Sequence, residues 1–290
     1  MKVSEILKNN EVTLSFEVFP PKTDASFADV ARAAGEIAAM KPHFMSVTYG
    51  AGGNTAANTA QLAEQLQKEH DVTVLAHLTC VAASRDDVRR MLTDYRSRGI
   101  ENIMALRGDI PKDGKRSEDY LYAVDLIRDI REIAGPDTFC IGGACYPEGH
   151  VECERQSEDI AHLKEKVEAG CSFLTTQMFF DNNTLYNFLY RIREAGIEVP
   201  VLPGIMPITN KKQVARSVAL SGATVPQRFR TMVDRYGDDP RKMQQAGVIY
   251  AAEQIIDLIA NGVNHIHVYS MNKPEIVEGI LNSFSAILGR

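Results

Sequence analysis

Eight short apolar runs alternate with longer helical patterns along almost the whole chain. Through the first seven runs, one follows another at about 30 residues, which is the length of a strand–helix–strand unit. Strict alternation of this kind predicts a parallel sheet whose crossover connections are right-handed, and so an α/β fold. The runs span residues 13–19, 44–50, 72–80, 101–109, 139–146, 172–180, 199–207 and 264–272.

Two α/β architectures remain open, a closed barrel and a doubly wound sheet. Eight units in 290 residues fit a (β/α)8 TIM barrel, whose usual size is about 250 residues. A doubly wound sheet would normally carry a G-x-G-x-x-G motif after its first strand. No such motif follows residues 13–19, and the glycines of YGAGGNT have the wrong spacing. We therefore predict a single barrel domain over residues 1–290, with extra helical segments at 210–221 and 239–262 before the last strand.

Serine and glycine residues mark the expected ends of several helices. Serine is a preferred N-cap, and glycine commonly follows the last helical turn. The predicted helices begin at Ser84, Ser117 and Ser157, and helices end at Gly99, Gly135, Gly170 and Gly196.

Composition and charge exclude several classes of partner. The net charge of −6 and pI of about 5.7 argue against nucleic acid or an anionic membrane as the main partner. The first residues lack the apolar run of a signal peptide, and no stretch approaches the roughly 18 apolar residues of a membrane span. We expect a cytoplasmic protein.

The five cysteines are scattered and odd in number, which suits reduced thiols. One group, comprising Cys140, Cys145, His150 and Cys153, raises the alternative of a metal site. Zinc sites usually show tight C-x2-C or H-x3-H pairs, and this spacing matches neither. We predict no metal.

The segment LSFEVFPPK, residues 14–22, places an acid near the end of the first predicted strand. Strand side chains alternate between faces, so Ser15, Glu17 and Phe19 are expected to face the barrel interior. Active sites of such barrels lie at the carboxyl ends of the strands. A half-buried carboxyl there should have a raised pKa and could act as a general acid. The alternative is an acid paired structurally with a lysine.

Polar residues also end several other predicted strands. Each alone has a structural explanation, such as a buried core histidine for His77 or a local salt bridge for Arg107 and Asp109. Gln177 could read the edge of a heterocycle because it carries both donors and acceptors, or it could cap the next helix. The polar strand-end residues are Thr48, Tyr49, His77, Thr79, Arg107, Asp109, Tyr146, Glu148, His150 and Gln177.

Eight motifs in order resemble one known family. SFEVFPPK, SVTYGAGG, LAHLTC, ALRGD, YPEGH, TTQMFF, PGIMPITN and HVYSMNKPE, from about residue 14 to 285, resemble the bacterial type of methylenetetrahydrofolate reductase. The resemblance implies a (β/α)8 barrel that binds FAD without a Rossmann motif. It also implies that the regulatory domain of the eukaryotic enzymes is absent.

The resemblance implies a two-step reaction. NADH or NADPH passes hydride to FAD and leaves, and 5,10-methylenetetrahydrofolate then takes its place. Glu17 would supply the proton that helps to open the folate ring to a 5-iminium cation. Asp109 would favour that cation electrostatically and tune the flavin. The product would be 5-methyltetrahydrofolate.

The same resemblance assigns binding residues. Arg107 and Lys166 would suit the charge of the FAD pyrophosphate. The substrate-binding positions are Asp109, Gln177, Gln213 and Lys273. The cofactor-binding positions are Thr48, Tyr49, Ala51, His77, Arg107, Gly108, Asp109, Tyr122, Ala123, Tyr146, His150, Asp159 and Lys166.

Four positions depart from the enterobacterial pattern. Lys273 replaces an arginine, so a bidentate grip on the folate glutamate becomes a point charge. His162 and Glu165 replace an asparagine and an arginine on the flavin-binding helix, and Ser217 replaces a phenylalanine.

By analogy with the family we expect a homo-oligomer, and an electron-transfer partner subunit is a further option. Two other interpretations stay open: a flavin-free barrel that transfers methyl groups from methyltetrahydrofolate, and a non-catalytic barrel subunit.

Overall fold

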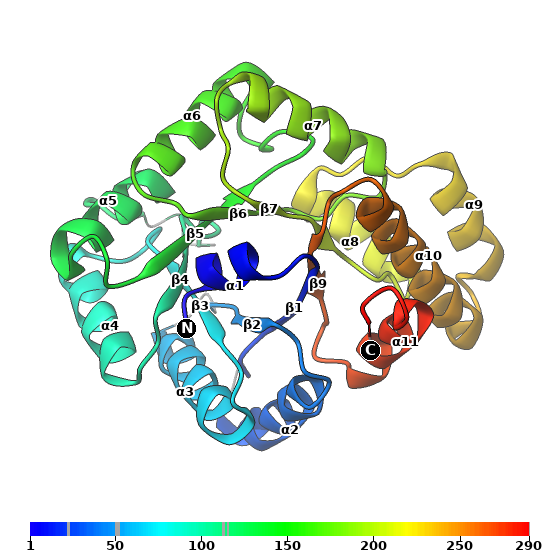
Figure 1. The fold of residues 1–290 in the computed structure, drawn as a ribbon, viewed down its shortest axis with the longest axis horizontal. Helices are drawn as coiled ribbons and strands as arrows, with labels where there is room; N and C mark the ends of the chain where they lie inside the picture. Colours follow the sequence, from blue (N-terminus) through cyan, green and yellow to red (C-terminus); the bar gives the residue numbers. More distant parts are fainter. Residues whose placement is uncertain (22–23, 50–52, 112–113, 115, 290) are drawn as a thin grey trace.

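The chain forms a parallel barrel of strands surrounded by helices (Figure 1). The computed structural model describes residues 1–21, 24–49, 53–111, 114 and 116–289. Every strand pair in the described part is parallel, and the order around the sheet is β7-β6-β5-β4-β3-β2-β1-β9-β8. The strands are β1 (Thr13–Val18), β2 (Phe44–Val47), β3 (Val74–Thr79), β4 (Asn102–Leu106), β5 (Cys140–Cys145), β6 (Phe173–Thr176), β7 (Val201–Leu202), β8 (Gly204–Ile205) and β9 (His265–Tyr269).

The seventh predicted run is divided at Pro203 into two short strands. Leu202 ends β7, which pairs with β6, whereas Gly204 begins β8, which pairs with β9. Proline has no N–H to donate to a ladder, but the Pro203 carbonyl still accepts from the His267 N–H at 2.9 Å. The two pieces together therefore fill one position in the barrel, and the predicted (β/α)8 fold is confirmed.

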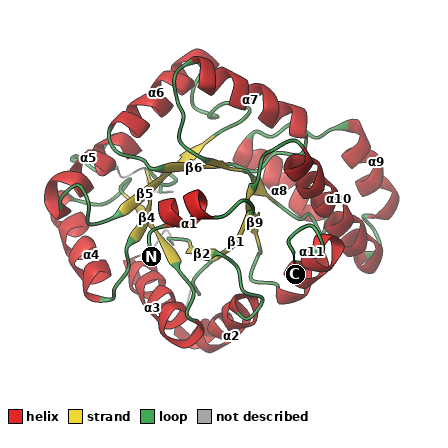
Figure 2. Cartoon of the chain, viewed as in Figure 1, coloured by secondary structure: helices red, strands yellow, loops and turns green. Residues whose placement is uncertain are grey.

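Helices form a ring outside the strands (Figure 2). They are α2 (Phe27–Ala38), α3 (Gly53–His70), α4 (Arg85–Ser97), α5 (Ala123–Ala134), α6 (Gln156–Glu168), α7 (Asn182–Glu194), α8 (Lys211–Ser221), α9 (Gln227–Tyr236), α10 (Pro240–Ala260) and α11 (Pro274–Phe284), with a 3-10 turn, η1, at Asp24–Ser26. A further helix, α1 (Val3–Asn9), lies inside this ring in the view of Figure 2. Helices α8, α9 and α10 confirm the extra helical segment before the last strand. Residues 224–236, between the two predicted helical segments, contain α9.

The main core lies between the strands and this ring of helices. Leu14, Phe16 and Val18 of β1 are fully buried in it. Because strand side chains alternate, Ser15 and Glu17 point to the opposite face, the barrel interior. The predicted orientation of Ser15 and Glu17 is confirmed, whereas Phe19 lies past the end of β1 and is exposed.

Helix α1 closes the amino-terminal end of the barrel, where it lies across the centre in Figure 1. Its Val3, Ile6 and Leu7 are buried in one cluster with Phe44, Leu75, Met104, Cys140, Phe173 and Leu202, which come from six strands. The Val3 N–H also donates to Asn102 Oδ1 at 2.7 Å. With this end filled, the opposite end of the barrel is left for a site.

The predicted helix ends are mostly confirmed. Ser84 caps α4, since its hydroxyl accepts from the Asp87 N–H at 3.2 Å. The glycines predicted to end four helices all have positive φ, at 71° for Gly99, 89° for Gly135, 121° for Gly170 and 79° for Gly196. Such angles are readily adopted by glycine after the last turn of a helix. Helix α6 begins at Gln156, within the usual uncertainty of the predicted start at Ser157.

The predicted start of the fifth helix at Ser117 is wrong, because α5 begins at Ala123. Ser117 instead accepts from the N–H groups of Asp119 and Tyr120, at 3.1 and 3.2 Å. Such side-chain acceptors stabilise a turn in place of the first helical hydrogen bonds. Among the described residues, no helix is both long and apolar enough to cross a membrane.

Candidate active site

Glu17 lies in a polar cluster inside the barrel, toward the carboxyl ends of the strands. Its Oε2 is 3.6 Å from His77 Nε2, 3.7 Å from His267 Nε2 and 3.4 Å from the Ser46 hydroxyl. These neighbours come from β3, β9 and β2, and the register pairs Glu17 directly with Ser46. The Glu17 side chain is 20% exposed. Its described partners are thus two histidines and a serine, not the lysine of the structural alternative.

The expectation of a raised pKa for Glu17 is wrong. Burial does raise the pKa of this carboxyl and is the largest single influence on it. The imidazoles of His267 and His77, at 3.7 and 3.6 Å, and the hydrogen bond donated by Ser46 together outweigh burial and hold the pKa of Glu17 below its usual range. In the protein without ligand, the carboxyl is therefore ionised at neutral pH.

His77 makes the protein sensitive to mild acid. Burial lowers the pKa of the His77 imidazole, and the Glu17 carboxylate opposes this only in part. The unfolded chain therefore binds a proton at His77 below pH of about 6.5, where the folded protein does not, so stability falls as the pH drops from that value.

We expect His77→Gln to remove this loss of stability between pH 7 and 5. One histidine changes the free energy of unfolding by at most about 1.4 kcal/mol per pH unit. Urea unfolding at several pH values measures it. The two proteins should show parallel profiles above pH 7. Equal slopes below pH 6.5 would contradict a neutral, buried His77.

Two buried polar atoms in this interior have no hydrogen-bond partner among the described residues: His77 Nε2 and Thr175 Oγ1. Thr175 lies two residues after the interior-facing Phe173 of β6 and shares its face. Buried polar atoms are normally paired. Both orphaned atoms therefore indicate a place where a bound group would supply hydrogen bonds.

The predicted anion-binding residue Arg107 follows β4 and makes a bidentate ion pair with Glu152. Its two terminal nitrogens lie 2.6 and 2.8 Å from the two carboxylate oxygens. The pair raises the pKa of Arg107 and lowers that of Glu152. Arg107 is thus already aligned for an oxyanion with carboxylate or phosphate geometry. Asp109, two residues on, is exposed and lies close enough to Arg107 and Tyr146 to affect their pKa values.

Four predicted cofactor positions lie after β5 and on α6. The rings of Tyr146 and His150 meet edge to face at 4.6 Å. The His150 N–H donates to Asp159 at 3.2 Å, and Lys166 Nζ donates to the Ala144 carbonyl at 2.5 Å. Arg107 influences the pKa of both Tyr146 and His150, so the structure brings these groups together with the arginine.

Gly108 has a φ of 89° and packs tightly. A Cβ there would lie 2.9 Å from Thr79 Cβ and 3.2 Å from Val81 Cγ1. Only glycine fits this position without strain.

The other predicted cofactor positions are spread over several elements. Tyr49 packs against the outer core, with the Tyr95 ring and Asp87 of α4 among its neighbours. Tyr122 is exposed and its ring stacks on His162 at 6.2 Å, and Ala123 begins α5. The Thr48 carbonyl accepts from Thr59 at 2.8 Å. Ala51 lies outside the described residues.

Of the predicted substrate positions, Gln177 and Lys273 follow strands β6 and β9, and Gln213 lies in a helix. Gln177 follows β6, and its Oε1 accepts from the Met178 N–H at 2.9 Å. Gln213 Oε1 accepts from the Thr209 N–H at 2.9 Å, in the first turn of α8. Lys273 is the N-cap residue of α11, after two residues, Met271 and Asn272, that both have a φ of 54°.

Among the departures from the enterobacterial pattern, His162 and Glu165 are exposed on α6, while Ser217 is buried in α8. The Ser217 carbonyl accepts from Ser221 at 2.8 Å.

Sequence reasoning did not single out Ser46, His267 or Glu152, and for Ser15 it predicted only the inward orientation. The alternation of polar His265, His267 and Tyr269 with buried Ile266 and Val268 was the available signal for His267. Nothing in the local sequence marks Glu152 as the partner of Arg107.

The cysteine group does not form one site. Cys140 belongs to the interior cluster with α1, whereas Cys145 is buried in the outer core. They lie on opposite faces of β5 and cannot bind one ion. Within the described ranges, no group of three or more His, Cys, Asp or Glu residues could hold a metal.

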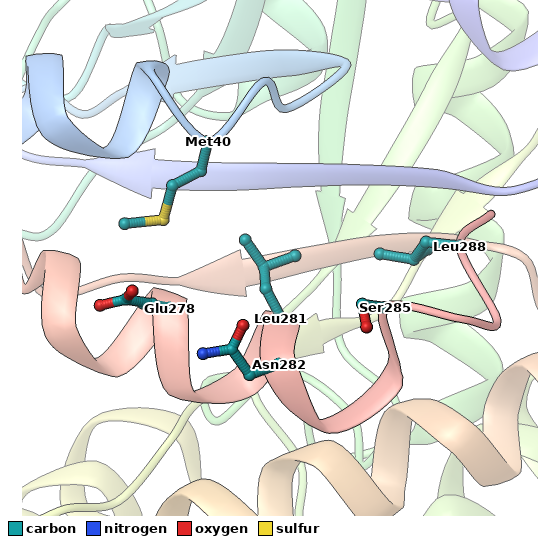
Figure 3. Close-up of a pocket in the computed structure, with 6 residues that line it drawn as sticks. All are labelled: Met40, Glu278, Leu281, Asn282, Ser285 and Leu288. Atoms are coloured by element: carbon teal, nitrogen blue, oxygen red, sulfur yellow. The ribbon is translucent and has the colours of Figure 1, made fainter. Parts of the chain in front are cut away.

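A shallow cavity of about 230 Å³ lies on the outside of the barrel between the end of α2 and α11 (Figure 3). Another, of about 330 Å³, lies against α7, α9 and α10. The predicted site residues line neither cavity. The first is lined by Met40, Glu278, Leu281, Asn282, Ser285 and Leu288.

Comparison with known proteins supports the resemblance noted in the sequence. The family model described as methylenetetrahydrofolate reductase matches residues 2–285. The 5,10-methylenetetrahydrofolate reductase of Pectobacterium carotovorum is 33% identical over 272 residues, covering 94% of this chain and 90% of that protein. The enzyme of the same name from Escherichia coli is 33% identical over 273 residues, with the same coverage.

Eukaryotic relatives are longer. Methylenetetrahydrofolate reductase 1 of Schizosaccharomyces pombe is 36% identical over 289 residues, and this chain spans 48% of its length. Among solved structures, a protein from Clostridium thermocellum that binds two copies of 5-methyl-5,6,7,8-tetrahydrofolic acid superposes with a TM-score of 0.66. Its identity is 14% and the match covers 100% of both chains, so that likeness concerns the fold alone.

Proposed function

Since this chain belongs to the methylenetetrahydrofolate reductase family, we propose that it reduces 5,10-methylenetetrahydrofolate to 5-methyltetrahydrofolate with electrons from NADH or NADPH. The observation that carries the proposal is Glu17, an ionisable group inside the barrel near the carboxyl ends of the strands, where active sites of this fold are built.

The site has features that fit FAD. His77 Nε2 and Thr175 Oγ1 are buried polar atoms that lack hydrogen-bond partners among the described residues. Arg107 presents a guanidinium already aligned with an anion, and Lys166 lies near its cluster. We propose that Arg107 and Lys166 bind the pyrophosphate, with His77, Gly108, Tyr146, His150 and Asp159 completing the cofactor site. When bound, FAD would take hydride from the nicotinamide and deliver it to the folate.

Glu17 has the role of general acid in this proposal. An amine nitrogen of the folate ring is a poor leaving group until it is protonated, and a positioned carboxylic acid can supply that proton. The surrounding β-strands hold the Glu17 side chain in the barrel interior. Fewer water molecules can compete for its proton there than at the protein surface.

Asp109 and the substrate-side residues act by charge and orientation. The exposed carboxylate of Asp109 would stabilise the positive charge that develops on the folate. Gln177 would contact the heterocycle through its amide, Gln213 would lie beside the substrate, and Lys273 would bind its terminal carboxylate as a point charge.

We further propose that residues 1–290 form a single catalytic barrel and that the protein assembles as a homo-oligomer. These proposals rest on the family.

Product analysis tests the function. Purified protein incubated with FAD, NADH and 5,10-methylenetetrahydrofolate should form 5-methyltetrahydrofolate, identified by mass spectrometry, as NADH is consumed in equal amount. NADPH in a parallel reaction decides the electron donor. If no methyl product forms with NADH and none forms with NADPH, the proposal is refuted.

Arg107→Lys should weaken FAD binding about tenfold, because lysine keeps the charge but loses the bidentate geometry. Glu152→Gln is the matched variant. It removes the carboxylate that holds Arg107 and should tighten FAD binding, since the anion no longer competes. Quenching of FAD fluorescence on binding measures both. Equal affinities for all three proteins would exclude Arg107 from the cofactor site.

A further inference from the structure

Inside the barrel, a continuous line of polar groups connects Glu17 to His267 and Ser15. His267 of β9 is 1% exposed. Its Nδ1 is 2.8 Å from the Ser15 hydroxyl, and its Nε2 is 3.4 Å from the Ser46 hydroxyl. Ser46 is in turn 3.4 Å from Glu17 Oε2. Ser46 therefore lies between the imidazole and the carboxylate, within reach of both.

The hydrogen bonds of Ser15 favour one tautomer of neutral His267. The Ser15 hydroxyl has one hydrogen and donates it to the Ile266 carbonyl at 3.2 Å. The contact between Ser15 and His267 Nδ1 is then satisfied only if Nδ1–H donates to the serine oxygen. In neutral His267 the Nε2 lone pair consequently faces Ser46 and Glu17, where it can accept a second proton.

The His267 ring is held in this orientation from two sides. Phe44 stacks on it at 6.4 Å with an interplanar angle of 13°, and Tyr269 meets it edge to face at 5.6 Å. The other titratable groups around Glu17 are His77 and Tyr269. Burial and the Glu17 charge raise the pKa of Tyr269 far above its usual value, so this phenol stays neutral.

We propose that His267 is a positioning residue that holds a proton for Glu17 and passes it to the carboxylate through the Ser46 hydroxyl. In this step the Nε2–H bond breaks and the hydrogen moves to the Ser46 oxygen. Ser46 simultaneously gives its own hydrogen to Glu17 Oε2. An imidazolium and a carboxylate become a neutral imidazole and a carboxylic acid, with Ser46 unchanged.

This inference rests on the proposed function, because it explains how Glu17 can act as an acid. Glu17 is ionised at neutral pH in the protein without ligand, owing to its histidine neighbours. A proton must therefore reach Glu17 from a nearby group. The Ser46 hydroxyl provides a path for the proton from His267 that needs no water molecule.

The first test measures the Glu17 carboxyl directly in the protein without cofactor. Protein with 13C-labelled glutamate carboxyls is titrated by NMR, and the Glu17 signal is identified by its absence in Glu17→Gln. His267→Gln should raise the pKa of Glu17, because it removes an imidazole 3.7 Å from the carboxylate that helps to hold this pKa low. Ser46→Ala should raise it less.

His265→Gln is the matched control. His265 lies on the same strand and the same face, one layer nearer the amino-terminal end, and its Nδ1 is 3.1 Å from the Thr13 hydroxyl. It should leave the Glu17 pKa unchanged. An unchanged Glu17 pKa in His267→Gln would overturn the inference.

The second test separates the two half-reactions of the FAD-loaded protein by anaerobic stopped-flow absorbance. In His267→Gln and in Ser46→Ala, flavin reduction by NADH should keep its rate. Reoxidation by 5,10-methylenetetrahydrofolate should slow about 10–100-fold, within the range of a lost proton-transfer partner. Equal slowing of both half-reactions, or no slowing of either, would overturn the relay.

The two tests distinguish the inference from the function on which it rests. If the unaltered protein fails to reoxidise with the folate, the proposed function fails. The carboxyl titration then still decides whether His267 controls the proton on Glu17.

Discussion

Glu17→Gln should retain flavin reduction by NADH and lose reduction of 5,10-methylenetetrahydrofolate by at least about 100-fold. Glutamine is close in shape to glutamate and can accept hydrogen bonds from Ser46 and the two histidines. It cannot release a proton, and general acids contribute typically 10²–10⁴-fold. Stopped-flow absorbance of the flavin, with each substrate added separately, measures the two rates.

Glu11→Gln is a suitable control, because Glu11 is exposed just before the same strand. It should leave both rates unaltered. Retained folate reduction in Glu17→Gln would exclude Glu17 as the proton donor, whereas loss of both rates would indicate damage to cofactor binding.

Gly247→Ala should destabilise the protein by about 2–4 kcal/mol, the range of severe overpacking. Alanine usually stabilises a helix relative to glycine by about 0.5–1 kcal/mol, so the expected sign is opposite to that of an exposed helical site. A Cβ at Gly247 would lie 1.8 Å from the Ile208 carbonyl oxygen and 2.7 Å from its carbon. Both are backbone atoms that cannot turn away.

Gly279→Ala on the neighbouring helix α11 is the matched control. Its Cβ would lie 3.2 Å from a Val248 methyl, which a small side-chain shift can relieve. Urea unfolding of both variants measures the difference. An unchanged free energy of unfolding in Gly247→Ala would contradict the close approach of α10 to the loop that leads to Gln213.

The parts of the fold that follow a regular period could be predicted from the sequence. Alternating apolar runs and helical patterns indicate the barrel, and the same alternation orients Glu17 inward. Glycines at helix ends carry their own signal, as the positive φ of Gly99 and Gly196 confirms.

Some features depend on competing local hydrogen bonds or on contacts between residues far apart in the sequence. These features could not be predicted from the sequence. Helix α1 is only seven residues long, too short to be stable without the barrel end it fills. The delayed start of α5 reflects side-chain hydrogen bonds of Ser117 that compete with helix formation. The interruption at Pro203 follows from the lack of a proline N–H, but an apolar run does not show which neighbour each half will pair with.

The electrostatics of the candidate site were the hardest to predict. Burial alone suggests a raised pKa for Glu17, yet His77 and His267 reverse the direction. His267 is far from Glu17 in sequence and adjacent in space, since β9 pairs with β1. Arg107 and Glu152 likewise meet only because the loops after β4 and β5 adjoin at the end of the barrel.

The most direct test of the account is the absorbance spectrum of the FAD-loaded protein under anaerobic conditions. Addition of NADH should bleach the flavin bands, and 5,10-methylenetetrahydrofolate should then restore them. Failure of the protein to bind FAD, or a reduced flavin that the folate does not reoxidise, would contradict the proposed reaction.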